Sequence, residues 1–252
     1  HNDVALQSAY SVATSEAEAS FGDGSVYLEK FVENARHIEV QIIADEHGKI
    51  VALGERECSV QRRHQKLIEE TPSTALKDSV RSKMLKAAVK VAKATRYSNA
   101  GTVEFLYDDD TSNFYFIEFN ARIQVEHPVT EEVFQKDLVV EQIRVASGEH
   151  LSFGNIKPRG HAIEARINAE DPDQDFQPSP GMVRELYLPG GPGIRVETHI
   201  RVGYTVPMYY DSMLAKVIAW GETRDQAIER LAGACDEFQI QGVSTTAGLC
   251  AR

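Results

Sequence analysis

The 252-residue chain has few cysteines, no long apolar run and no leader-like N-terminus. Its three cysteines, Cys58, Cys235 and Cys250, lie far apart and form no CxxC pair, which indicates a reducing compartment, the cytoplasm or, in a eukaryote, an organellar matrix. We expect Cys58 to be a buried structural thiol and not a nucleophile. No stretch approaches the ~18 apolar residues of a membrane helix, and no basic segment precedes an apolar one as in a signal peptide. We therefore expect no membrane contact.

The chain also lacks an excess of basic residues. Its formal net charge is −11, which argues against a nucleic-acid partner, because nucleic-acid-binding proteins present a basic face to the phosphates. This charge does not exclude phosphate ligands, since a local group of basic residues can hold them. The first residue is not methionine, and we expect the chain to be a fragment of a longer protein.

Hydrophobic periodicity predicts a mixed α+β fold. Apolar residues recur at helical spacing in residues 3–20, 76–95, 131–147 and 222–238. Strand-like patterns occupy residues 26–32, 36–42, 50–57, 159–168, 182–187, 194–198 and 213–220. We expect the basic segment 59–66 to be a short loop pinned between strands, where its Gln, His and Lys side chains suit an anion or a ribose. A solvated surface loop is the alternative.

Acidic and polar residues concentrate in residues 101–130. Two apolar runs, 102–107 and 114–119, flank a turn rich in Asp, Thr and Asn, which is typical of a β-hairpin. Each run contains one carboxylate, Glu104 or Glu118, and such a group is costly to bury unless it is paired or bound to a metal. If the register places both on one face, they suit Mg²⁺ or Mn²⁺. A proton-sharing acid/base pair and two unrelated surface glutamates are the alternatives.

Seven motifs, in order along nearly the whole chain, resemble biotin carboxylase, a member of the ATP-grasp superfamily. They are EKFV at 29–32, RHIEVQ at 36–41, QRRHQK at 61–66, FIEFNARIQVEHPVT at 116–130, RINAEDP at 166–172, PSPG at 178–181 and YYDSM at 209–213. The resemblance implies an antiparallel ATP-grasp sheet with flanking helices over residues 1–158. It also implies the start of the biotin carboxylase C-terminal subdomain over residues 159–252. The family's N-terminal domain and glycine-rich phosphate loop are not in this stretch, so we expect the fragment by itself to be inactive.

The resemblance also implies an activity and partners. ATP and bicarbonate form carboxyphosphate, and the carboxyl group then passes to biotin on a carrier protein or domain. A carboxyltransferase component completes the system and selects the final acceptor. The full-length form is expected to be a homodimer. Another ATP-grasp ligase, such as half of a carbamoyl-phosphate synthetase, and a non-catalytic folded remnant are the alternatives; the motifs that begin at Arg166 and Tyr209 favour biotin carboxylase.

Position by position, the resemblance implies a role for individual residues. Glu126 is the general base that deprotonates bicarbonate, and Arg122, Gln124 and the backbone of Val125 hold this anion. A general base works best with a pKa near neutral, and we expect a buried pocket to raise the pKa of Glu126. Glu118, Arg122 and Glu126 recur every four residues, which argues against a chance surface pattern. His127 has a structural and a catalytic interpretation, and both remain open.

The other implied residues bind cations, phosphates or the nucleotide. Lys66 and Arg166 neutralise the carboxyphosphate and biotin enolate. The metal ligands are Glu104 and Glu118, with Asn120 close by. The remaining ATP contacts are Glu29, Lys30, Val32, His37, Gln61, His64 and Leu106, together with Glu104 and Glu118. Ala121, where relatives commonly have Thr or Pro, is a mild departure from the family pattern.

Overall fold

The structure, a computed structural model, describes residues 2–252. The chain divides into two compact units, the first ending at Glu33 and the second running from Asn34 to Arg252. In the first unit, helix α1 (Asp3–Phe21) begins after Asn2, whose side-chain oxygen accepts a hydrogen bond from the Ala5 amide at 2.8 Å. Gly22 ends the helix in the left-handed conformation. The helix predicted over residues 3–20 is confirmed.

The segment after α1 corrects one prediction, because residues 26–32 do not form a strand. A strand must pair its backbone groups with a neighbour, and none of the strands in the described residues 2–252 pairs with this segment. Its large apolar side chains, including Tyr27, Leu28 and Phe31, are exposed. The strand prediction was wrong because it rested on apolar content alone and not on a pairing partner.

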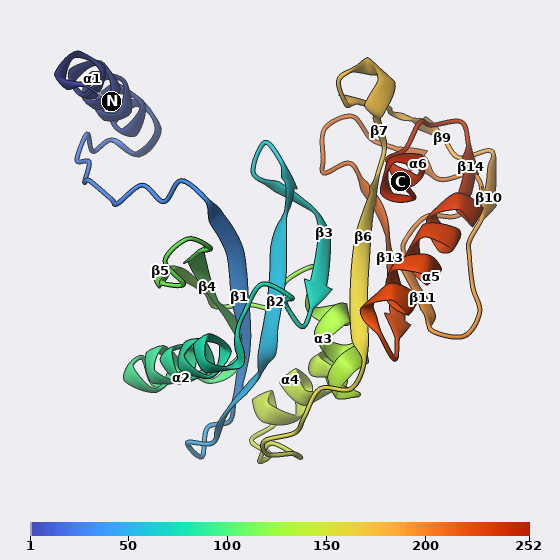
Figure 1. Ribbon diagram of the computed structural model, residues 1–252. Coiled ribbons are helices and arrows are strands. Elements are labelled where there is room, and N and C mark those ends of the chain that lie inside the picture. Colours follow the sequence, from blue (N-terminus) through green and yellow to red (C-terminus); the bar gives the residue numbers. More distant parts are fainter. Residues whose placement is uncertain (1) are drawn as a thin grey trace. The chain divides into compact units, whose positions relative to one another are not determined.

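Eight strands of the second unit form one antiparallel sheet in the spatial order β11-β13-β6-β3-β2-β1-β4-β5 (Figure 1). Their bounds are β1 Ala35–Ala44, β2 Ile50–Arg62, β3 Gln65–Thr71, β4 Asn99–Asp108, β5 Phe114–Asn120, β6 His161–Asn168, β11 Ile194–Thr198 and β13 Met213–Gly221. The sheet joins the two portions predicted from the sequence, 1–158 and 159–252, through the ladder between β3 and β6. The boundary between those portions stays a prediction.

Three short strand pairs accompany the large sheet. They are β7 (Glu170–Asp171) with β8 (Gln177–Pro178), β9 (Gly181–Met182) with β12 (Thr205–Val206), and β10 (Glu185–Tyr187) with β14 (Gln239–Gln241). The single strand predicted over residues 182–187 is therefore wrong, because the chain there divides between β9 and β10. A short 3₁₀ helix, Pro172–Gln174, follows β7.

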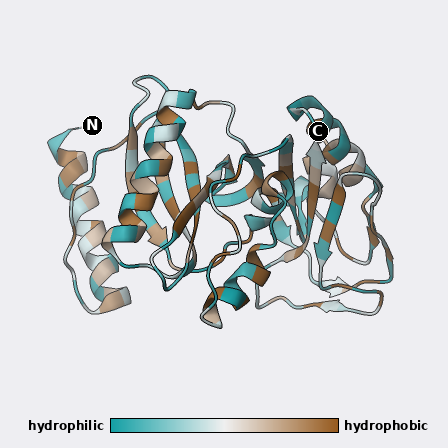
Figure 2. Cartoon of the chain, turned by 90° about the horizontal axis from the view of Figure 1, so that it is seen from below, coloured by the Kyte–Doolittle hydropathy of each residue, from teal (hydrophilic) through white to brown (hydrophobic). Residues whose placement is uncertain are grey.

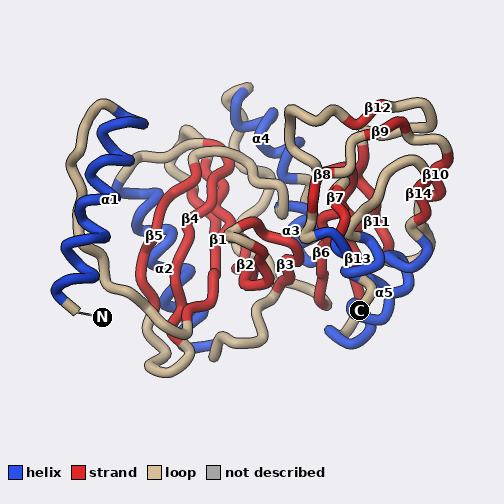
Figure 3. Tube along the Cα trace, turned by 90° about the horizontal axis from the view of Figure 1, so that it is seen from above, coloured by secondary structure: helices blue, strands red, loops and turns tan. Residues whose placement is uncertain are grey.

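Helices cover both faces of the sheet (Figures 1 and 3). The helices are α2 Asp78–Ala94, α3 His127–Phe134, α4 Leu138–Ala146, α5 Arg224–Glu237 and α6 Ala247–Cys250. Helix α2 packs on Ile38, Val40 and Ile42 of β1, and α5 packs on alternate residues of β6 and β13 on the same face. Helix α3 packs against the other face. Figure 2 shows both hydrophobic and hydrophilic residues along the strands, and successive side chains of a strand point to opposite faces of the sheet.

Two predicted boundaries are corrected in this unit. The basic segment 59–66 is not a pinned loop: β2 continues to Arg62 and β3 starts at Gln65, so the turn is only Arg63 and His64. Both turn residues have positive φ, as tight two-residue hairpins favour. The helix predicted over residues 131–147 is two helices, because Gln135 adopts a left-handed conformation that ends α3. The Asp137 side chain then caps α4.

Candidate active site

A pocket of about 350 Å³ brings the predicted site residues together. It is lined by His37, His64, Gln65, Lys66, Glu104, Glu118, Asn120, Arg122, Gln124, Val125, Glu126 and Arg166. Apart from Gln65, every lining residue is one that the sequence marked as functional. The pocket therefore combines the hairpin of β4 and β5, the turn before α3 and the strands β1, β3 and β6.

The two hairpin carboxylates share one face of the sheet. Glu104 on β4 and Glu118 on β5 are direct cross-strand partners, and side chains of directly opposed residues lie on the same face. The Asn120 amide nitrogen donates to Glu104 Oε1 at 3.0 Å and to Glu118 Oε1 at 2.9 Å. Two carboxylates and one amide oxygen are hard ligands of the kind that Mg²⁺ takes in proteins. The donor chemistry of this corner fits a magnesium ion.

Glu104 is an ionised group in this pocket. Burial alone would raise its pKa, but the hydrogen bond from His37 at 2.7 Å and the charge of Lys66 lower the pKa to about 2. Glu104 also accepts from the Gln124 amide nitrogen at 2.7 Å. The carboxylate is thus held negative and oriented by three different elements, as a cation ligand should be.

Lys66 is the positive centre of the pocket. Its ammonium group lies 2.6 Å from Glu39 Oε2, 2.6 Å from Glu126 Oε1 and 3.4 Å from Glu104 Oε1. Burial alone would lower its pKa, but these three carboxylates raise the pKa above its usual value. Lys66 therefore stays charged and faces the space where an anionic substrate would enter.

The predicted base, Glu126, sits between two cations. It is 2% exposed, and its carboxylate meets Lys66 at 2.6 Å and Arg166 at 3.0 Å. We expected burial to raise its pKa, and that prediction is wrong. Burial does act in that direction, but the charges of Arg56, Lys66 and Arg166 outweigh it and lower the pKa to about 2. Without anions in the pocket, Glu126 is therefore a weak base.

Behind Arg166 lies a pair of buried carboxyl groups. Arg166 Nε donates to Glu69 Oε1 at 2.6 Å, and Glu69 is the cross-strand partner of Glu164. Both glutamates are 0% exposed, and one Glu69 oxygen and both Glu164 oxygens lack a hydrogen-bond partner among the described residues. Burial and the adjacent carboxylates raise the pKa of Glu164 well above its usual value and the pKa of Glu69 to about 7. The surroundings of Glu164 therefore favour the neutral form of its carboxyl group.

Sequence reasoning missed the buried guanidinium of Arg56. This side chain is 0% exposed and donates to Glu39 at 2.5 Å, to Gln41 at 2.6 Å and to the Gln124 side-chain oxygen at 3.2 Å. It also donates to Thr130 at 3.1 Å and Thr102 at 3.2 Å. Because Gln124 gives its oxygen to Arg56, its amide nitrogen must face Glu104. No local pattern marks Arg56, which stands in the ordinary charged sequence GERE.

The turn before α3 presents the groups assigned to bicarbonate. Arg122 is exposed, lines the pocket and donates to the Ile123 carbonyl at 3.1 Å. Its guanidinium has the planar fork that matches a planar anion. Val125 also lines the pocket, whereas His127 is not among the lining residues. The ring nitrogen Nδ1 of His127 instead donates a hydrogen bond to the Gln124 carbonyl at 2.8 Å.

The predicted ATP contacts fall in different places. His37 accepts a hydrogen bond from Gln61 at 2.9 Å and donates one to Glu104. Gln61 therefore contacts a lining residue but does not itself line the pocket. His64 lines the pocket from the β2–β3 turn. Leu106 lies on β4 as the cross-strand partner of His37 and is half-buried. Glu29, Lys30 and Val32 belong to the first unit, so their roles stay predictions.

Comparisons with known families match both parts of the chain. The family model described as "Carbamoyl-phosphate synthase L chain, ATP binding domain" matches residues 1–153. The "Biotin carboxylase C-terminal domain" matches residues 164–252. Biotin carboxylase of a Nostoc species is 54% identical over 94% of this chain and 53% of its own length. Biotin carboxylase 1 of Bacillus subtilis is 53% identical over 93% of this chain and 53% of its own length.

Solved structures resemble the chain along its whole length. A biotin carboxylase complex from Campylobacter jejuni has a TM-score of 0.95 and 47% identity, covering 100% of this chain and 56% of that one. The biotin carboxylase domain dimer of the Hydrogenobacter thermophilus 2-oxoglutarate carboxylase, in complex with MgADP, ADP and bicarbonate, has a TM-score of 0.94 and 46% identity, with the same coverage. The chain thus spans about half the length of the proteins it matches. Within residues 2–252, no helix is long and apolar enough to span a membrane.

Proposed function

Because the chain belongs to the biotin carboxylase family of ATP-grasp proteins, we propose that its full-length protein carboxylates biotin with ATP and bicarbonate. One observation carries the proposal: the carboxylate of Glu126 touches both Lys66 and Arg166 at the wall of a pocket whose other corner holds Glu104 and Glu118. A proton acceptor, two anion-binding cations and a divalent-cation corner are the groups that this reaction needs.

In the first step, bicarbonate attacks the γ-phosphorus of ATP. A phosphorus–oxygen bond to bicarbonate forms, the bond to the ADP oxygen breaks, and the bicarbonate proton passes to Glu126. Arg122 and the Val125 backbone hold the planar anion, and Lys66 offsets negative charge on the transferred phosphoryl group. Magnesium held by Glu104, Glu118 and Asn120 would neutralise phosphate charge.

The low pKa of Glu126 has a role in this scheme. The anionic substrates compete with Glu126 for Lys66 and Arg166, because each cation has a limited set of donors. As those ion pairs weaken, burial dominates and the pKa of Glu126 rises. The base therefore becomes effective only when both anions are bound, which protects ATP from idle turnover.

In the second step, the carboxyl group moves to biotin. The carbon–oxygen bond of carboxyphosphate breaks, phosphate leaves, and a bond forms between the carboxyl carbon and N1′ of biotin, whose proton phosphate accepts. We assign to Arg166 the role of balancing the enolate-like charge that develops on biotin. A carrier protein or domain and a carboxyltransferase component are the partners we infer, with a homodimer as the assembly. The three cysteines are free, which supports a reducing compartment such as a cytoplasm or organellar matrix.

The test measures ADP release by the full-length protein with ATP, magnesium and free biotin, with and without bicarbonate. We expect bicarbonate-dependent ADP release that falls by roughly a hundredfold or more in Glu126→Gln, as for loss of a general base. Undiminished turnover in that variant contradicts the role of Glu126. Ammonia-dependent ADP release without any effect of biotin would instead indicate a carbamoyl-phosphate-type ligase. Titration of the 252-residue chain with MgATP then tests whether this stretch alone retains an ATP half-site: binding favours a retained half-site, and no binding fits a non-catalytic remnant.

A further inference from the structure

The turn that carries the proposed bicarbonate contacts is held from behind by two side chains outside the pocket lining. The Gln124 carbonyl accepts hydrogen bonds from His127 Nδ1 at 2.8 Å and from the His127 amide at 3.3 Å. The next carbonyl, that of Val125, accepts from Lys216 Nζ at 3.0 Å. Two successive carbonyl groups are thus fixed by groups that lie away from the pocket.

This arrangement determines where the neighbouring amides point. In a trans peptide unit the C=O and N–H groups point in opposite directions. The Val125 N–H shares a peptide unit with the Gln124 carbonyl, and the Glu126 N–H shares one with the Val125 carbonyl. Both carbonyls point to residues outside the lining, whereas Val125 and Glu126 line the pocket. Both amides consequently point toward the pocket, and neither donates to another group in residues 2–252.

His127 is chemically suited to this task because its ring is neutral. Burial is the main reason that its pKa falls to about 4, and the charge of Lys216 lowers it further. A neutral ring carries one proton, and the Gln124 carbonyl can only accept, so that proton lies on Nδ1. The ring therefore fixes the Gln124 carbonyl without placing a positive charge in competition with Lys66 and Arg166.

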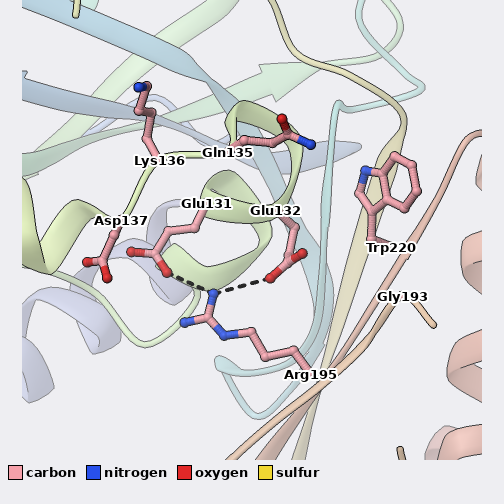
Figure 4. A pocket seen from close by; sticks show the side chains of 8 residues that line it. All are labelled: Glu131, Glu132, Gln135, Lys136, Asp137, Gly193, Arg195 and Trp220. Atoms are coloured by element: carbon pink, nitrogen blue, oxygen red, sulfur yellow. Dashed lines mark hydrogen bonds and ion pairs between the residues drawn. The ribbon is translucent and has the colours of Figure 1, made fainter. Parts of the chain in front are cut away.

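Lys216 is itself held in place by a chain of ion pairs. Glu197 is its cross-strand partner, and the Glu197 carboxylate lies 2.5 Å from Lys216 Nζ. Arg195 binds the same carboxylate and also reaches Glu131 at 2.9 Å and Glu132 at 3.2 Å. Figure 4 shows the Arg195 guanidinium between these two glutamates of α3, at the edge of a second pocket of about 500 Å³. The helix that follows the turn is thereby tied to the strand that presents Lys216.

We propose that Lys216 and His127 are positioning residues that aim the Val125 and Glu126 amides at the bound bicarbonate. The inference rests on the proposed function and extends it to residues that do not line the pocket. Neither residue reacts: each acts by fixing a peptide plane. Loss of either allows the plane to rotate, and the pocket then loses an N–H donor that is worth most when its partner is an anion.

The test compares Lys216→Met with wild type in the full-length protein, by measuring KM for bicarbonate and KM for ATP separately. We expect KM for bicarbonate to rise by roughly tenfold, which corresponds to ~1.4 kcal/mol, while KM for ATP changes less than about twofold. Lys216→Arg, which keeps a charged donor, should recover part of the loss. Lys86→Met, on the exposed side of α2, is the matched control and should leave both constants unchanged.

Other outcomes overturn the inference. Unchanged KM for bicarbonate in folded Lys216→Met contradicts it, and so does an equal rise of both constants, which indicates general damage. If that variant does not fold, Glu197→Gln gives the same test, because it leaves Lys216 in place but weakens its anchor. His127→Phe should also raise KM for bicarbonate, because it removes the side-chain donor to the Gln124 carbonyl. If wild type shows no bicarbonate-dependent ADP release at all, the proposed function fails, and this result is distinct from active wild type with unaffected variants.

Discussion

Glu104 and Glu118 oppose each other directly across the β4–β5 ladder, and one Asn120 amide donates to both carboxylates. Two like charges on one face repel each other, although the hydrogen bond from His37 and the charge of Lys66 hold Glu104 ionised. Such a pair is stabilised fully when a cation binds between its members. We therefore expect the loss of one carboxylate to leave stability intact or improve it without a cation, and to weaken cation binding.

Glu118→Gln should leave thermal stability unchanged or slightly higher in the absence of magnesium, because it removes a repelling charge from an exposed position. In the full-length protein, the same change should raise the KM for MgATP by roughly tenfold, since the proposed cation site loses one hard anionic ligand. Melting curves with and without magnesium, together with ATP kinetics, check both effects. A variant that melts lower and binds MgATP normally would contradict the assignment.

The buried pair Glu69 and Glu164 predicts an unusual pH dependence of stability. The folded-state pKa of Glu69 rises from 4.5 to about 7. The folded state then binds more protons than the unfolded state between those values, so this contribution is complete below pH 4.5 and is lost as the pH rises through 7. The size is at most about 3 kcal/mol. The pKa values of Glu104 and Glu126 fall to about 2, and their effect on stability has the opposite sign. Their contribution is present above pH 4.5 and is lost as the pH falls toward 2.

Urea unfolding of wild type and Glu69→Gln between pH 4.5 and 7.5 measures this effect. The variant should show a shallower fall of the unfolding free energy over that window. Glu70→Gln is the matched control, because Glu70 lies next in the strand but its pKa is lowered through its hydrogen bonds with His161 and Arg224, despite burial. Identical slopes for wild type and Glu69→Gln would contradict the raised pKa.

Arg56→Met should be among the most destabilising single changes in the second unit. It leaves Glu39, also 0% exposed, without the guanidinium that bonds to it at 2.5 Å. Removing one partner of a buried ion pair costs about 3–5 kcal/mol. Arg159→Met is the comparison, because Arg159 and its partner Glu222 are exposed and such pairs contribute about 0–1 kcal/mol. Equal midpoints of urea unfolding for the two variants would show that Arg56 is not a structural centre.

Local patterns predicted the elements whose structure depends on neighbours in sequence. The hairpin around Glu104 and Glu118, the strand of His37 and the helix α2 follow from alternation or helical spacing, and the structure contains them. Cys58 was expected to be buried and is. Two predictions failed for different reasons. Residues 26–32 lack a strand partner, which only distant segments could supply. Gln135 adopts a left-handed conformation that ends a helix which apolar spacing alone would continue.

The candidate site likewise contains residues that the sequence located and properties that it could not predict. Eleven of the twelve pocket-lining residues lie within the motifs that resemble biotin carboxylase, so the resemblance located them. The pKa of Glu126 could not be predicted, because the three cations that lower it come from β2, β3 and β6, far from Glu126 in the sequence. Arg56 and Lys216 were missed for a related reason. Each looks like an ordinary surface charge until the sheet buries it beside the pocket.

The electrostatic balance at Glu126 yields a final prediction. Arg166 lies 3.0 Å from its carboxylate, and loss of an adjacent opposite charge raises the pKa of a carboxyl group by about 1–3 units. Arg166→Met should therefore raise the pKa of Glu126 from about 2 toward the ordinary value. Titration of ¹³C-labelled glutamate carboxyls by NMR measures the shift, with Glu126→Gln assigning the resonance. Arg224→Met, which removes a partner of Glu70 and not of Glu126, should leave that resonance unmoved. An unchanged titration in Arg166→Met would mean that Lys66 and Arg56 alone hold Glu126 ionised, and the proposed rise of its basicity when anions engage Arg166 would then have to be abandoned.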